Sequence, residues 1–168
     1  MRDESLQKQS KASMIGIRES FKDLKNNFDL TLDRSRFSMD FYYPVLCGLP
    51  FDEKVFFDAF DSFYLPNLGI KCVSEEPWVT VAETCECALA LLKIGYPEKA
   101  KNLLSEVLKI SDGQNIPFMG WQYQEEIFWP EEQPTWTAGA MLLLIDALYE
   151  LTPAACIFMD SLSFVDTQ

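Results

Sequence analysis

The chain has 168 residues, 48% of them hydrophobic, and a formal net charge of −12, which suits one packed, acidic domain. It contains no histidine, and this excludes a histidine-based catalytic triad, a histidine-containing zinc site and the usual proton shuttle near neutral pH. Residues 110–168 carry nine acidic and no basic side chains, and a field of that sign repels nucleic acids and anionic membrane surfaces. We therefore expect no nucleic-acid partner, no metal and no cofactor, and any acid–base chemistry falls to carboxylates.

The N-terminus is polar and shows no secretory signal, and no segment approaches the roughly 18 apolar residues of a membrane span. By default this predicts a cytoplasmic protein. The five cysteines are then expected to be reduced and mostly buried.

Apolar spacing and end signals predict six helices in chain order. They are the N-terminal stretch to about Asn27, Ser38 to Cys47, Asp52 to about Leu65, Thr80 to Ile94, Pro97 to about Ile110, and Thr135 to Leu151. The first, third and fifth are amphipathic, whereas the helices that begin near residues 38, 80 and 135 are apolar on most sides. This alternation predicts outer helices that wrap inner ones.

The connections between these helices differ in length. Those from inner to outer helices are tight, and those from outer to inner helices, 66–79 and 111–134, are long. Both long loops should therefore lie at one end of the domain, above the N-termini of the inner helices. The pattern predicts an all-α fold, an α/α-toroid of the six-hairpin type of which this chain supplies about three hairpins, a half-toroid.

Each long loop contains two acidic residues, then a proline and a tryptophan, just ahead of an inner helix. The first has Glu75 and Glu76 before Pro77 and Trp78, and the second has Glu131 and Glu132 before Pro134 and Trp136. In a glycosidase two carboxylates flank the sugar, so Glu75 and Glu132 are the candidate catalytic pair. The alternative, slightly favoured, is that these acids only complement the helix dipoles.

Aromatic residues gather in the same loops. Trp78, Trp121, Tyr123 and Trp136 are candidates for stacking a ligand, with Trp129 beside them. The alternative is that about three of these five aromatic residues anchor the loops on the core.

Three further acidic residues stand at the starts of inner helices. Glu83 follows Thr80 by three residues, which predicts a capping box, with a role in substrate binding as the alternative. Asp40 is expected to be an N-cap and is a weaker binding candidate. Glu86 is either exposed or, on a buried face without a partner, has a raised pKa.

The segments SRFSMDFYYPVLCG, YLPNLGIKCVSEEPWVTVAETCECALALLKIG and MGWQYQEEIFWPEEQPTWTAGAMLLLIDAL resemble the C-terminal part of bacterial α/α-toroid proteins labelled prenyltransferase-like or six-hairpin-glycosidase-like. The resemblance covers residues 35–158 of a single 1–168 domain, with an outer helix and linker at 1–34 and a tail at 159–168. Members are about twice as long, which implies that this chain either pairs with a second copy or another chain to complete the ring or is a remnant of such a protein. Their acidic–basic pair and arginine are replaced here by Glu75–Glu76 and Gln133.

The labels come from the fold and do not fix the chemistry. A zinc-dependent prenyltransferase needs a histidine, and a terpene cyclase needs an acid-rich motif such as DDxxD or DxDD, which this chain lacks. We therefore expect a small-molecule ligand, a carbohydrate before an isoprenoid, with glycosidase-like catalysis open. A non-catalytic interaction module is the remaining alternative.

Overall fold

The computed structural model describes residues 4–23, 31–156 and 159 of the chain. These residues belong to two compact units, of which one is Ser35–Ser161 and the other contains the first helix. Each unit is considered by itself. The larger unit starts where the predicted 35–158 region starts.

The first helix, α1, spans Glu4–Phe21 and ends earlier than predicted. Residues 24–30, which include the predicted helix end at Asn27, lie outside the described part. Leu6 and Ile17 on α1 are exposed.

The larger unit contains the five other predicted helices, and their ends agree with the sequence analysis to within about one turn. They are α3 (Met39–Leu46), α4 (Glu53–Phe63), α5 (Val81–Lys93), α6 (Pro97–Val107) and α7 (Thr135–Tyr149), followed by a short 3-10 helix, η1 (Pro153–Cys156). The end signals act as expected. The Asp52 carboxylate accepts a hydrogen bond from the Val55 amide at the start of α4, and Gly95 has a φ of 90° just after α5.

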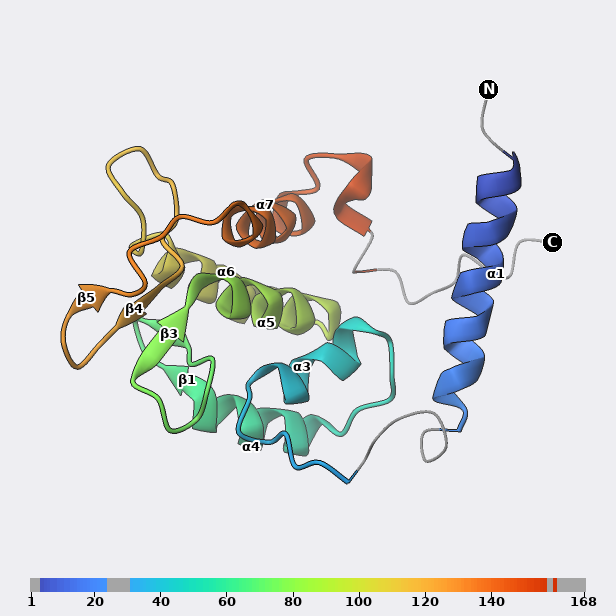
Figure 1. The fold of residues 1–168 in the computed structure, drawn as a ribbon, viewed down its shortest axis with the longest axis horizontal. Coiled ribbons are helices and arrows are strands. Elements are labelled where there is room, and N and C mark those ends of the chain that lie inside the picture. The colour runs from blue at the N-terminus through green and yellow to red at the C-terminus, as the bar shows by residue number, and fades with distance from the viewer. Residues whose placement is uncertain (1–3, 24–30, 157–158, 160–168) are drawn as a thin grey trace. The chain divides into compact units, whose positions relative to one another are not determined.

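Helix α5 is the centre of the larger unit. It packs against α3 on one side and α7 on the other, with α6 behind it, and α4 packs on α3 (Figure 1). Most of its residues are buried, including Cys85, Cys87 and Leu91. The unit is therefore built around α5, and the predicted toroid of inner and outer helices stays a prediction.

The expectation of a purely helical fold is wrong, because the long loops form two small antiparallel sheets. Strand β1 (Tyr64–Leu65) pairs with β2 (Gly69–Ile70), and β4 (Gly120–Gln122) lies between β3 (Trp78–Thr80) and β5 (Ile127–Phe128). The unit is mostly helical, with these strands added at one end. Strands of two or three residues are too short for a period-two pattern, yet they give the loop backbone its hydrogen bonds.

The pairing of β3 with β4 joins the two long loops, which the sequence predicted to lie at one end of the domain. Val79 from the first loop lies opposite Trp121 from the second, and the Val81 amide at the start of α5 donates to the Met119 carbonyl oxygen. At the start of α3, the Ser38 amide donates to Cys72 in the first loop. The N-termini of the inner helices α3 and α5 are thus held to the joined loops.

In the described part of the chain, no helix is long and apolar enough to cross a membrane. The same residues contain no group of three or more acidic or cysteine side chains placed to hold a metal ion.

Candidate functional site

A cavity of about 450 Å³ lies over α5, between α3 and α7. Each helix contributes residues spaced by three or four positions, so a single face of each lines the cavity. The lining residues are Tyr43, Leu46 and Cys47 from α3, Glu86 and Leu89 from α5, and Trp136, Gly139, Ala140 and Leu143 from α7. The cavity is therefore built from the inner-helix faces that the outer helices leave uncovered.

Among the residues that line this cavity, Glu86 is the only one with an acidic or basic side chain. Its carboxylate Oε2 accepts hydrogen bonds from the hydroxyls of Tyr42 at 3.2 Å and Tyr43 at 3.1 Å. Tyr42 is fully buried, whereas Tyr43 is exposed at the cavity. The two adjacent tyrosines of α3 thus fix the position of the Glu86 carboxylate.

Burial raises the pKa of Glu86, and the nearby Glu83 carboxylate adds to this shift. The hydrogen bonds from Tyr43 and Tyr42 favour the charged form, but burial outweighs them. The same surroundings raise the pKa of the Tyr43 hydroxyl to about 12, mainly through burial and the Glu86 charge. Glu86 therefore has the property of a proton donor, a carboxyl group that keeps its proton to a higher pH than usual.

Glu83 lies one turn before Glu86 on the same face of α5, and the predicted capping box is wrong. Thr80 makes no side-chain cap hydrogen bond. Instead the Cys72 thiol donates to Glu83 Oε1 at 3.5 Å, and the buried Oε2 has no hydrogen-bond partner. The Val81 amide at the start of α5 donates to the Met119 carbonyl oxygen of the neighbouring loop instead. The Glu83 side chain lies on the same face of α5 as Glu86.

Asp40 is not the N-cap of α3, as was predicted, because Ser38 holds that position and Asp40 lies in the first turn. Asp40 lines a second, mostly apolar cavity of about 350 Å³ between α3 and α4, with Phe41 and Phe56. It is therefore separated from the Glu86 cavity by α3 itself.

Glu75 and Glu132 have different partners in the described part of the chain, and their pairing at one site stays a prediction. The Glu75 carboxylate accepts from the Ser74 hydroxyl at 2.7 Å and pairs with Arg36. The Ser74 hydrogen bond, with help from the backbone and Arg36, lowers the pKa of Glu75. Glu132 is exposed, and its backbone carbonyl accepts from the Met119 amide.

Of the candidate stacking residues, Trp136 lines the Glu86 cavity and is 55% exposed. The Trp78 ring lies edge-to-face against Trp129, with centroids 5.3 Å apart. Trp121 and Tyr123 are partly buried and pack on the core, which is the anchoring alternative.

Gln133, which replaces an arginine of the toroid proteins, has a local role. Its side-chain amide donates to Asp112 Oδ2 at 3.0 Å and to the Ile116 carbonyl oxygen at 3.1 Å. The hydrogen bond from Gln133, followed by those from the Ile116 and Gln114 amides, lowers the pKa of Asp112. Gln133 therefore closes the 112–116 turn.

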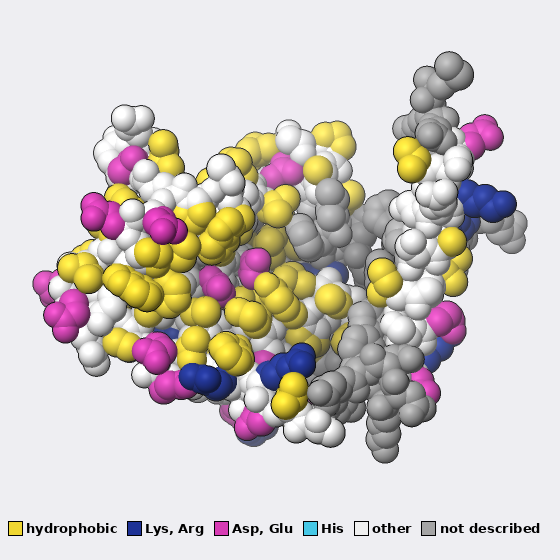
Figure 2. Space-filling view, in the orientation of Figure 1, with side chains coloured by type: hydrophobic (Ala, Val, Ile, Leu, Met, Phe, Trp, Pro, Cys, Tyr) yellow, Lys and Arg dark blue, Asp and Glu magenta, His cyan; other side chains and the backbone are white. Residues whose placement is uncertain are grey.

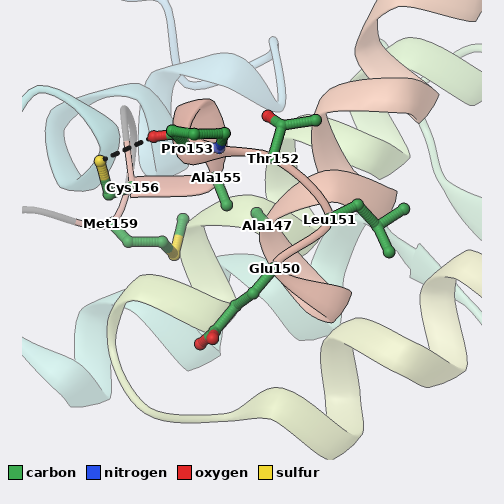
Figure 3. Close-up of a pocket in the computed structure, with 8 residues that line it drawn as sticks. All are labelled: Ala147, Glu150, Leu151, Thr152, Pro153, Ala155, Cys156 and Met159. Carbon is green, nitrogen blue, oxygen red and sulfur yellow. Dashed lines mark hydrogen bonds between the residues drawn. The ribbon is translucent and has the colours of Figure 1, made fainter.

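A larger cavity, about 610 Å³, lies at the C-terminal end of α7 and is lined by residues of η1 and of the preceding turn. Figure 3 shows the Glu150 carboxylate extending away from Pro153 and Ala155. Without converging polar groups, this cavity has less to orient a ligand than the Glu86 cavity. Figure 2 shows acidic side chains in the region of α5, enclosed by hydrophobic ones.

The sequence analysis singled out Glu86 only through its pKa and missed Tyr43 altogether. The available signal was spacing, since Tyr43, Leu46 and Cys47 recur at three and four positions on an inner helix that is too apolar to show which face is exposed.

Comparison with known proteins gives one informative similarity. Over 128 residues the chain is 39% identical to the MMP endo-(1,4)-3-O-methyl-alpha-D-mannosidase of Mycolicibacterium hassiacum. The chain is homologous to a glycosidase. The alignment covers 74% of this chain but 36% of the mannosidase, so the chain spans little more than a third of that protein's length. No family model matches the chain.

Proposed function

We propose that the chain binds a carbohydrate in the cavity between α3, α5 and α7. The observation that carries the proposal is that Glu86 and Trp136 line the same cavity. A half-exposed indole offers a flat apolar face for a sugar ring, and a carboxylate accepts hydrogen bonds from its hydroxyls. The remaining walls are aliphatic, as in most small-molecule sites.

The homologous mannosidase supports the carbohydrate class and narrows it. Its name states an action on (1,4)-linked 3-O-methyl-α-D-mannosides, and we propose the same kind of sugar for this chain. The isoprenoid alternative from the sequence analysis has no comparable support, although an apolar cavity would also accept a prenyl chain.

Glycosidase-like hydrolysis is the second part of the proposal. Glu86, with its raised pKa, would donate a proton to the glycosidic oxygen as that bond to the sugar breaks, and water would supply the new hydroxyl group. Glu83 is the second carboxylate of this proposal, because it lies one turn earlier on the same face of α5 and its charge raises the pKa of Glu86.

Calorimetric titration with a panel of oligosaccharides tests the binding. The panel contains α-1,4-linked mannotetraose with and without 3-O-methyl groups, cellotetraose as an unrelated sugar, and farnesol as the isoprenoid probe. We expect binding of the mannosides by the full chain and loss of binding in Trp136→Ala. A folded sample that takes up only farnesol supports the isoprenoid alternative, and one that binds nothing supports the interaction module.

Hydrolysis of the bound mannoside distinguishes the two proposed carboxylate pairs. Glu86→Gln and Glu83→Gln should keep binding and lose on the order of a hundredfold or more in rate, the usual range for a general acid. Glu75→Gln and Glu132→Gln are matched substitutions at the loop pair predicted from the sequence. If they, and not the α5 variants, abolish hydrolysis, the assignment to α5 is wrong.

A further inference from the structure

We infer that Gly139 of α7 determines which sugars the cavity accepts, because its missing side chain leaves room for an apolar substituent on the ligand. This inference rests on the proposed carbohydrate site. It concerns the wall of the cavity that α7 forms, across from the wall formed by α3 with Tyr43.

No feature of the fold accounts for a glycine at this position. Gly139 lies inside α7, where glycine is a poor helix former. Its φ is not in the left-handed region, and a Cβ built on it would have no atom within 4 Å. Gly120, by contrast, is held against Val79 and Trp78. The space beside Gly139 belongs to the cavity that this residue lines.

The polar groups of the cavity are concentrated on one side. Glu86 and the Tyr43 hydroxyl lie 3.1 Å apart, whereas the wall that α7 adds to the lining, with residues such as Gly139 and Leu143, is apolar apart from the indole nitrogen of Trp136. A sugar hydroxyl turned toward that wall would lose its hydrogen bonds to water and find no partner among those side chains. A methyl ether at the same place has no donor to satisfy and gains apolar contact. The α7 wall therefore selects a sugar whose face carries an apolar substituent.

The size of Gly139 sets how much room that substituent has. A methyl side chain at residue 139 would occupy part of the open space beside α7, and a leucine would occupy more of it. One methylene in an apolar pocket changes affinity by roughly 10–200-fold. Alanine is a better helix former than glycine, so Gly139→Ala should not lower the stability of the fold.

The test is calorimetric titration of the full chain and of Gly139→Ala and Gly139→Leu with methylated and unmethylated mannotetraose. We expect Gly139→Ala to weaken binding of the methylated sugar on the order of tenfold and the unmethylated sugar less. Gly139→Leu should abolish binding of the methylated sugar. Melting temperatures should show that Gly139→Ala is at least as stable as the original chain.

Gly16 provides the matched control, because it is also a helical glycine with nothing within 4 Å of a built Cβ, and it lines none of the three cavities. Gly16→Ala should leave sugar binding unchanged. If the original chain binds the mannosides but the Gly139 variants bind them equally well, the inference is overturned and the proposed function stands. If the original chain binds no sugar, both are overturned.

Discussion

Individual side chains decide the chemistry of this molecule, and Glu86 is the main case. It combines a position at a cavity, two tyrosine donors and a pKa raised by burial. Glu75, one of the two catalytic candidates from the sequence, has a salt bridge to Arg36 and a lowered pKa. The two carboxylates are therefore suited to different roles, a proton donor and a structural ion pair.

The pH dependence of stability should differ in sign between these two residues. Because the folded-state pKa of Glu86 lies above its ordinary value of 4.5, its contribution to stability is present below that value and is lost as pH rises through the raised pKa. Glu86→Gln should remove this loss, so the variant gains stability relative to the original chain across that window. Urea unfolding at several pH values measures it.

Glu75→Gln serves as the comparison of opposite sign. The pKa of Glu75 is lowered, so its contribution is present above the ordinary value and disappears as pH falls through the lowered pKa. At pH values above the ordinary pKa of 4.5, Glu75→Gln should therefore be less stable than the original chain. Equal pH profiles for both variants would contradict the assignment of a buried Glu86.

Thr80 and Thr84 test the corrected view of the start of α5. Thr84 Oγ1 accepts from the Ile70 amide at 2.9 Å and donates to the Thr80 carbonyl at 2.7 Å, so Thr84→Val should cost about 1–3 kcal/mol by leaving a buried amide unpaired. The buried Thr80 hydroxyl has no partner, so Thr80→Val should be nearly neutral. A large loss in Thr80→Val by thermal unfolding would restore the capping box.

At the scale of elements, the small sheet that joins the two long loops fixes the start of α5. Gly120 in β4 lies so close to β3 that a Cβ would be 2.3 Å from the Val79 carbonyl oxygen and 2.6 Å from Trp78 Nε1. Backbone atoms are hard to displace. The pairing of β3 with β4 therefore depends on glycine at this position.

Gly120→Ala should destabilise the fold by about 1–3 kcal/mol or more, the range for overpacking. Gly113→Ala is the control, because a Cβ there meets nothing within 4 Å. Chemical denaturation of both variants measures the difference. Similar midpoints would show that the sheet tolerates the added methyl group.

The helices could be predicted from the sequence because their apolar spacing and stop signals, such as Gly95 and Pro97, are local. The strands could not, since a pairing such as Val79 with Trp121 links residues far apart in the chain. For the same reason the sequence left Glu86 either exposed or buried, and it did not reveal the hydrogen bonds from Tyr42 and Tyr43. The acids and tryptophans of the two long loops gave a regular pattern. In the structure Glu75 pairs with Arg36, Trp121 packs on the core and Trp136 lines the cavity, none of which that pattern shows.

At the scale of the whole molecule, the exposed apolar surface of α7 is the main feature. Leu142 and Leu151 are each 66% exposed, and Tyr149 is 55% exposed. The chain also spans 36% of its mannosidase relative. Large exposed apolar patches usually mark an interface. The sequence-based prediction of a dimer or a partner chain stays a prediction, with these side chains of α7 and of the turn after it as its candidate site.

Light scattering at micromolar concentration should show a dimer or a larger species, and Leu142→Lys should shift it toward the monomer. The expected effect comes from placing a charge in an apolar contact. A clean monomer of 19.3 kDa at all concentrations, with no partner chain present, would contradict self-association through this face.

The most direct measurement is a crystal structure of the full chain with α-1,4-linked 3-O-methylmannotetraose. The predicted result is a sugar ring stacked on Trp136, with a glycosidic or hydroxyl oxygen within hydrogen-bonding distance of Glu86 and a methyl ether beside Gly139. A sugar held instead at the loops, between Glu75 and Glu132, or in the cavity at the C-terminal end of α7, would contradict the proposed site.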